Sequence, residues 1–115
     1  MSQNRIFSMI GLAQKAGKVA SGEFSTEKAV KEGRAGLVIV SIEASDNTKK
    51  KFLNMCAYYK VPLYFYGTKA ELGLAIGREF RASLAVTDRG LAEAIKKQMP
   101  DENDGGRQYG ENQGT

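Results

Sequence analysis

Apolar and polar positions along this chain follow two different patterns. Three short runs are apolar at nearly every position and rich in β-branched or aromatic residues, and they predict buried strands: Leu37–Val40, Leu63–Tyr66 and Ser83–Val86. Elsewhere apolar residues recur every three or four positions, which predicts amphipathic helices. Helices and strands that alternate in this way are typical of an α/β fold.

Glycines and small polar residues place the ends of the first two helices. The first helix has an apolar face that begins at Ile6, and it should end around Ala16. A short extended piece follows at Val19–Ala20. Ser21–Gly22 then opens the second helix, and Gly33 fits a C-terminal glycine stop for it.

Three further helices are predicted downstream. Ser45 and its polar neighbours supply capping groups for the third helix. Its inward-facing residues should be Phe52, Leu53, Cys56 and Tyr59. Gly67–Thr68 turns into a fourth helix that ends between Gly73 and Gly77. Thr87–Asp88 caps the last one, whose apolar face should consist of Leu91, Ala94, Ile95 and Met99.

These elements predict a three-layer α/β/α sandwich, with helices on both faces of a mixed sheet of about four short strands. The 115 residues suit one domain, which we place at residues 1–100. Residues 101–115 are acidic and glycine-rich, so we expect a disordered tail. The chain has no apolar run near the roughly 20 residues that cross a bilayer. It also has no signal-peptide pattern, so we expect a cytoplasmic protein.

The charge of the chain is unevenly distributed. The net charge is +4, but residues 101–115 contain four acids and one base and carry −3, which leaves +7 on residues 1–100. A compact domain of that charge favours polyanionic partners. RNA, DNA and an anionic membrane surface all fit this criterion.

The residue types argue against catalysis. The chain has no histidine, which removes the commonest general base and metal ligand. Cys56 lies on an apolar helix face, where a buried, inert thiol is expected. The stretch Gly11–Lys18 looks like a phosphate loop, but it has one residue too many between its glycines and lacks the Ser or Thr after the lysine. We therefore predict no enzyme activity, no cofactor and no metal.

Basic and aromatic residues concentrate in two candidate binding clusters. The first surrounds the start of the second helix and consists of Lys15, Lys18, Ser21, Phe24, Ser25, Lys28 and Lys31. Free N–H groups at a helix N-terminus bind phosphate, and lysines add further phosphate contacts. The second cluster precedes the last strand and consists of Arg78, Phe80 and Arg81. Arginines and aromatic rings can stack on unpaired bases.

Each aromatic residue also has a purely structural interpretation. Phe24 could pack inward at the start of its helix, and Phe80 could lie in the core. The run Lys49-Lys50-Lys51 is interpreted as a solvated helix face, because three consecutive helical residues point in different directions.

Three segments resemble one known family in sequence and in order. They are Leu12–Gly22, Lys28–Val40 and Leu72–Gly77 followed by Ala85–Asp88. Together with the lysine-rich stretch Ser45–Lys51, they resemble the ribosomal L-seven-Ae/L-thirty-e family of kink-turn-binding proteins, in its YlxQ-like bacterial branch. The resemblance covers residues 4–98. It implies a three-layer fold, no catalysis, and RNA binding by the N-terminus of the second helix together with the loop before the last strand.

The resemblance also exposes a departure at the implied site. In the family, a Gly-Thr-Asn-Glu run reads sheared G·A pairs, and a lysine follows one turn later. Gly22 and the lysine at position 28 match this pattern, whereas Glu23, Phe24 and Ser25 occupy the Thr, Asn and Glu places. Phe24 can stack on a base but cannot form amide-type hydrogen bonds. The match at Gly22 and Lys28 predicts RNA binding at this surface, whereas the departure at positions 23–25 leaves kink-turn specificity open.

We predict a non-enzymatic, ribosome- or structured-RNA-associated protein that grips a kinked or internally looped RNA helix and acts as a monomer. The alternative is a protein-interaction or assembly module on the same scaffold, since a fold does not fix a function. Salt dependence separates the two, because phosphate contacts weaken steeply as salt rises.

Overall fold

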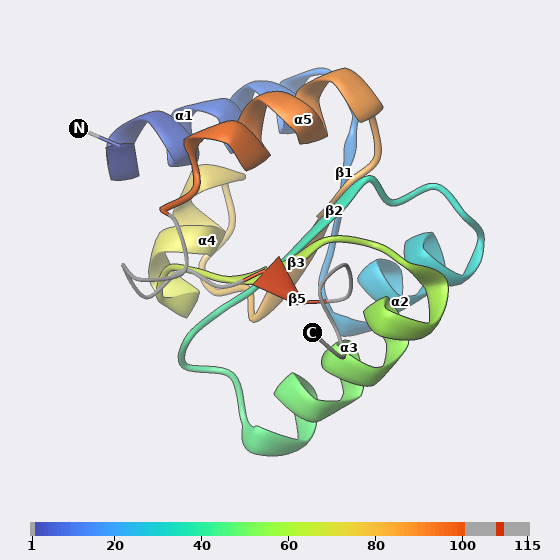
Figure 1. Cartoon of the computed structure of the whole chain (residues 1–115). Coiled ribbons are helices and arrows are strands. Elements are labelled where there is room, and N and C mark those ends of the chain that lie inside the picture. Colours follow the sequence, from blue (N-terminus) through green and yellow to red (C-terminus); the bar gives the residue numbers. More distant parts are fainter. Residues whose placement is uncertain (1, 101–107, 110–115) are drawn as a thin grey trace.

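The chain folds into one mixed β-sheet with helices on both of its faces (Figure 1). This architecture comes from a computed structural model that describes residues 2–100 and 108–109. The helices are α1 (Ser2–Lys15), α2 (Glu23–Lys31), α3 (Asp46–Tyr59), α4 (Lys69–Ala75) and α5 (Arg89–Gln98). The strands are β1 (Val19–Ser21), β2 (Leu37–Val40), β3 (Leu63–Phe65), β4 (Ser83–Val86) and β5 (Gln108–Tyr109).

The sheet has the strand order β1-β4-β2-β3-β5. β2 and β3 run parallel, because a helical crossover joins them, whereas β4 is antiparallel to both of its neighbours. β2 is buried along its whole length, as expected of a strand covered on both faces.

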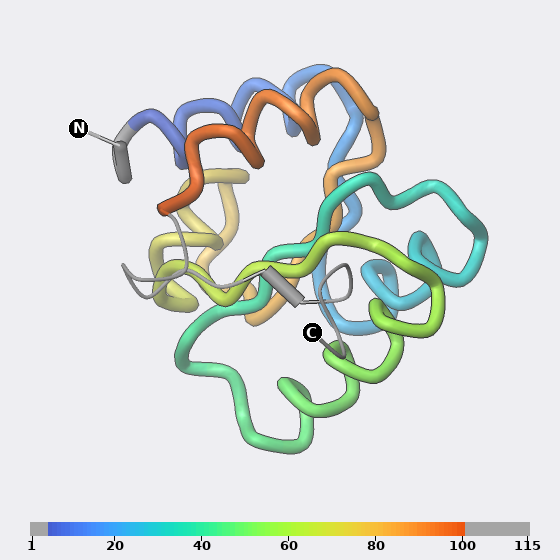
Figure 2. The backbone as a smooth tube through the Cα atoms, viewed as in Figure 1, coloured from blue at the N-terminus to red at the C-terminus, as the bar shows by residue number. Residues whose placement is uncertain are grey.

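Alternate residues of β2 point into two separate apolar layers. Leu37 and Ile39 pack with α1, α4 and α5 on one face, whereas Val38 and Val40 pack with α2 and α3 on the other. Figure 1 shows these two groups of helices on opposite sides of the sheet, and Figure 2 shows α1 and α5 side by side. The predicted three-layer α/β/α sandwich is therefore confirmed.

The helix boundaries follow the predicted capping residues. The Ser45 hydroxyl accepts a hydrogen bond from the Thr48 N–H at 3.1 Å, and the Asp88 carboxylate accepts one from the Leu91 N–H at 2.9 Å. Thr68 and Glu71 form a reciprocal capping box at the start of α4. These contacts satisfy backbone groups that the first turn of each helix leaves unpaired.

Two details differ from the sequence prediction. Tyr59 was expected to face inward, but it is 41% exposed because it is the last residue of α3, next to the left-handed residue Lys60. Within the predicted tail, Gln108 and Tyr109 pair with β3 as a fifth, two-residue strand. The other residues of the tail lie outside the described part of the chain, so the disorder predicted for it stays a prediction.

Candidate nucleic-acid interface

The sheet brings the two predicted clusters to the same place. β1 and β4 are antiparallel neighbours with Ser21 opposite Leu84, so the end of β1 lies beside the start of β4. The N–H of Gly22 continues this pairing by donating to the carbonyl of Ser83 at 2.9 Å. The N-terminus of α2 and the loop before β4 therefore meet, although they are far apart in the sequence.

An open groove of about 500 Å³ lies where these two segments meet. Its described lining residues are Val19, Ala20, Ser21, Phe24, Ser25, Lys28, Arg34, Arg78 and Arg81. Four of these residues are cations and none is an acid, so the lining has a net positive charge. Such a concave, positively charged surface raises the local concentration of a polyanion.

The N-terminus of α2 opens toward the groove without a side-chain cap. Gly22 precedes the helix with φ of 91°, a conformation that L-residues rarely adopt, and it has no side chain to cap the helix. The first helical bond runs from the Thr26 N–H to the Gly22 carbonyl at 2.9 Å. The three preceding N–H groups are therefore available to an anion, and the helix dipole favours such a ligand.

Arg81 fixes the loop to β1. Its Nε donates to the Ser21 hydroxyl at 3.1 Å, and another guanidinium nitrogen donates to the Phe80 carbonyl at 2.8 Å. The side chain is half-buried, because these bonds hold it against the strand. Arg81 therefore has a structural role here in addition to its charge.

A glycine in α4 allows the same loop to approach closely. A Cβ atom on Gly73 would stand 2.5 Å from the carbonyl oxygen of Glu79 and 2.8 Å from the nitrogen of Phe80. The N–H of Arg78 also donates to the Gly73 carbonyl at 2.8 Å. Gly73 was not among the predicted site residues, because a packing requirement of this kind depends on a contact across the fold.

Both aromatic residues of the candidate clusters are exposed. Phe24 is 76% exposed and Phe80 is 61% exposed, so neither packs in the core. Exposed rings beside cationic side chains can act as stacking platforms for unpaired bases. This arrangement favours the binding interpretation of both residues over the structural one.

Not every predicted cation belongs to the groove. Lys15 and Lys18 are exposed at the other end of β1, where the carbonyl of Lys18 accepts from the Thr87 N–H. Lys31 is near the C-terminus of α2 and pairs with Glu27 at 2.8 Å, so it lies away from the groove. Arg34 does line the groove, with its Nε 2.9 Å from a carboxylate oxygen of Glu32. Arg34 was not among the predicted site residues.

Glu23 belongs to an ion-pair network on another side of α2. Its carboxylate lies 3.0 Å from Nζ of Lys51, which also lies 2.8 Å from Glu27. Hydrogen bonds from Lys31 and Lys51 lower the pKa of Glu27, and the bonds to Glu27 and Glu23 raise the pKa of Lys51. Lys51 thus lies at the surface, as the predicted solvated helix face requires, but its ammonium group is paired with two carboxylates.

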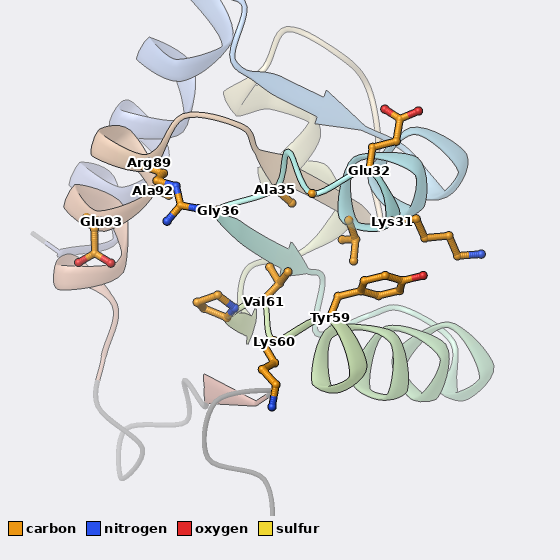
Figure 3. A pocket seen from close by; sticks show the side chains of 13 residues that line it. Lys31, Glu32, Ala35, Gly36, Tyr59, Lys60, Val61, Arg89, Ala92 and Glu93 are labelled. Carbon is orange, nitrogen blue, oxygen red and sulfur yellow. The ribbon is translucent and has the colours of Figure 1, made fainter.

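A second hollow of about 580 Å³ lies at the other end of α2. Figure 3 shows it between Lys31 and Tyr59 on one side and Arg89 and Glu93 on the other. Its described lining contains three cations, Lys31, Lys60 and Arg89, and two acids, Glu32 and Glu93. Although this hollow is the larger one, its mixed charge fits a polyanion less well than the groove does.

Three findings on the described residues bear on metal binding, cysteine reactivity and membrane insertion. No group of three or more acidic, cysteine or histidine side chains among them could hold a metal ion. Burial raises the pKa of the Cys56 thiol to about 12, so this cysteine remains protonated at neutral pH. No helix in the described part of the chain is long and apolar enough to cross a membrane.

The fold and the groove define a small α/β/α domain with a basic surface at a helix N-terminus. The model of the ribosomal protein L7Ae/L30e/S12e/Gadd45 family matches residues 4–96, and the chain belongs to this family. The names of this family and of its members, which are ribosomal and RNA-binding proteins, point to a non-enzymatic protein, as predicted. Within the family, the chain falls in the YlxQ-like bacterial branch.

Relatives with known names and structures support this assignment. The chain is 44% identical to the RNA-binding protein YlxQ of Bacillus subtilis over 95 residues, which cover 83% of this chain and 95% of that protein. It is 36% identical to the large ribosomal subunit protein eL30 of Trypanosoma brucei brucei, over 70% of this chain and 79% of that protein.

A solved structure has the same fold. A protein of unknown function from Bacillus halodurans C superimposes with a TM-score of 0.79 at 36% sequence identity, and the match covers 81% of this chain and 94% of that one. Despite the departures at positions 23–25, the chain therefore retains the backbone architecture of its family.

Proposed function

We propose that this protein binds structured RNA in the groove between the N-terminus of α2 and the loop before β4. The observation that carries the proposal is the convergence there of uncapped helical N–H groups, four cations and no acid among the described lining residues. Phosphate binding needs both free donors and positive charge. The names of YlxQ and eL30, an RNA-binding and a ribosomal protein, point to the same ligand class.

The groove suits an RNA helix that is kinked or internally looped. A regular A-form duplex offers its phosphates and shallow groove, but it keeps its bases stacked. The exposed rings of Phe24 and Phe80 gain a partner only where a base is unstacked. The ligand is therefore an RNA with an unpaired base next to a backbone that Lys28 and the arginines can contact.

Selectivity at this surface differs from the Gly-Thr-Asn-Glu pattern of the family. Ser25 is shorter than glutamate and uncharged, and Phe24 offers a ring in place of an amide. The protein therefore selects RNA by shape and stacking more than by hydrogen bonds to G·A pairs. We place it in the cytoplasm as a monomer associated with ribosomal or other structured RNA.

A titration at two salt concentrations tests this proposal. A fluorescent RNA that contains a kink-turn and a plain duplex of equal length are titrated at 50 mM and 200 mM salt. Up to four phosphate contacts predict a loss of affinity of about 50- to 150-fold between these salt concentrations. Lys28→Ala, which removes an exposed cation from the lining, should reduce the salt slope by about one.

The results separate RNA binding from the alternative. Tighter binding of the kinked RNA, with a steep salt slope, supports the proposal. Equal, weak binding of both RNAs would agree with attraction between the cations and RNA phosphates, but it would contradict a preference for kinked or looped RNA. No binding to either RNA contradicts the proposal and leaves a protein-interaction module as the function.

A further inference from the structure

The first two turns of α2 present carboxylates on the face of the helix beside the groove in which a polyanion is proposed to bind. Glu23 is the first residue of the helix, and Glu27 follows one turn later on the same face. Successive helical residues are about 100° apart, so this face adjoins the stripe that carries Phe24 and Lys28. Two uncompensated negative charges in this position would repel the RNA backbone.

Lys51 holds both of these carboxylates. Its Nζ lies 3.0 Å from Oε2 of Glu23 and 2.8 Å from Oε1 of Glu27, while Lys31 lies 2.8 Å from the other oxygen of Glu27. Lys51 comes from α3, so the contact also joins α3 to the N-terminal half of α2. The hydrogen-bonding partners of its ammonium group are thus acids, and Lys51 is absent from the lining of the groove.

We infer that Lys51 is a positioning residue of the RNA site, which acts through Glu23 and Glu27 and does not contact the RNA. It offsets the negative charge at the start of α2 and holds this helix end against α3. The inference rests on the proposed function. It adds to the site a residue of α3, which neither lines the groove nor was predicted as a site residue from the sequence.

A cycle of variants tests this inference on the full-length chain. RNA affinity is measured for the wild type, Lys51→Met, the double variant Glu23→Gln/Glu27→Gln, and the combination of all three substitutions. Lys51→Met should weaken binding on the order of three- to tenfold, because the start of α2 loses its contact with α3 and one positive charge is lost within about a Debye length of the phosphates. In the Glu23→Gln/Glu27→Gln background, the same substitution should have a clearly smaller effect, because the contact that holds the helix is already absent and only the charge of Lys51 is lost.

Three further measurements distinguish positioning from direct contact. The salt slope should stay unchanged in Lys51→Met, whereas Lys28→Ala should reduce it by about one. Lys51→Arg should restore the affinity, because a guanidinium can bridge both carboxylates. Lys50→Met removes a neighbouring exposed lysine as a matched control, and it should leave the affinity nearly unchanged.

The outcomes are distinct. An equal loss of affinity in both backgrounds, with a smaller salt slope, would show that Lys51 contacts phosphate and would overturn the inference. No loss of affinity in either background would show that the ion pairs of Lys51 have no role in RNA binding, and this result would also overturn the inference. Neither of these two results contradicts the proposed function, provided that Lys28→Ala weakens RNA binding and reduces the salt slope. A wild-type protein that binds no RNA would overturn the proposed function and the inference on Lys51 together. Melting temperatures within about 5 °C of the wild type show that each variant is folded.

Discussion

Replacement of Gly73 by alanine should displace the loop before β4 without removing any side chain of the site. The new Cβ atom would stand 2.5 Å from the Glu79 carbonyl oxygen, where ordinary contacts begin at 3.4 Å. The atoms in contact are backbone, so rotation of a side chain cannot relieve the overlap. The loop must therefore move away from α4 by about 0.9 Å, the difference between these two distances.

The cost of this movement follows from packing and helix propensity. Overpacking of a well-packed site costs about 1–3 kcal/mol, and the higher helix propensity of alanine returns up to about 1 kcal/mol. We expect a net loss of about 1–2 kcal/mol in the free energy of unfolding, or roughly 4–8 °C in Tm for each kcal/mol. The loss of one charged hydrogen bond to RNA from the displaced loop would weaken binding by at least about tenfold.

Thermal unfolding and RNA titration of Gly73→Ala check both numbers. Gly90→Ala is the matched control, because a Cβ there would meet only the Asp88 carboxylate oxygen at 3.4 Å, an ordinary contact. It should keep or slightly raise Tm and leave RNA affinity unchanged. If Gly73→Ala kept both its Tm and its RNA affinity, the reasoning that α4 fixes the loop by close contact would be refuted.

Other substitutions test separate parts of the site. Arg81→Ala should weaken RNA binding and also lower Tm by several degrees, because the variant loses the hydrogen bond to Ser21. An unchanged Tm would contradict the conclusion that Arg81 fixes the loop to β1. Phe24→Ala should cost about 1–3 kcal/mol of RNA binding by titration if a base stacks on it, with little change in Tm, since the ring is exposed. The lowered pKa of Glu27 contributes stability above the pKa of an unfolded glutamate, about 4.3, that is lost as pH falls through its folded value. Glu27→Gln should remove this part of the acid dependence in pH-dependent melting curves.

The sequence predicted most of the fold because its local signals agree with the tertiary structure. The run of β2 is apolar at every position, as a strand buried on both faces requires, and its alternate residues pack into two cores. Ser45 and Asp88 cap the helices where their positions predicted. Each of these signals depends on a few neighbouring residues, which a sequence shows directly.

The site was harder to predict because it depends on contacts between distant segments. From the sequence, Lys31 was grouped with Phe24 and Lys28 in one binding cluster, but it pairs with Glu27 and does not line the groove. The role of Gly73 arises from a loop that the sheet folds back onto α4. Arg34 enters the groove because of the turn that follows α2. None of these contacts has a signature within a short stretch of sequence.

The most direct test of RNA binding in the groove is a map of amide chemical shifts in the labelled protein as a kinked RNA is added. The proposal predicts that the largest changes fall at residues 21–28 and 78–82, with small changes around the hollow near Lys60 and Arg89. Changes centred on that hollow, or spread evenly over the surface, would contradict the assignment of the groove as the RNA site.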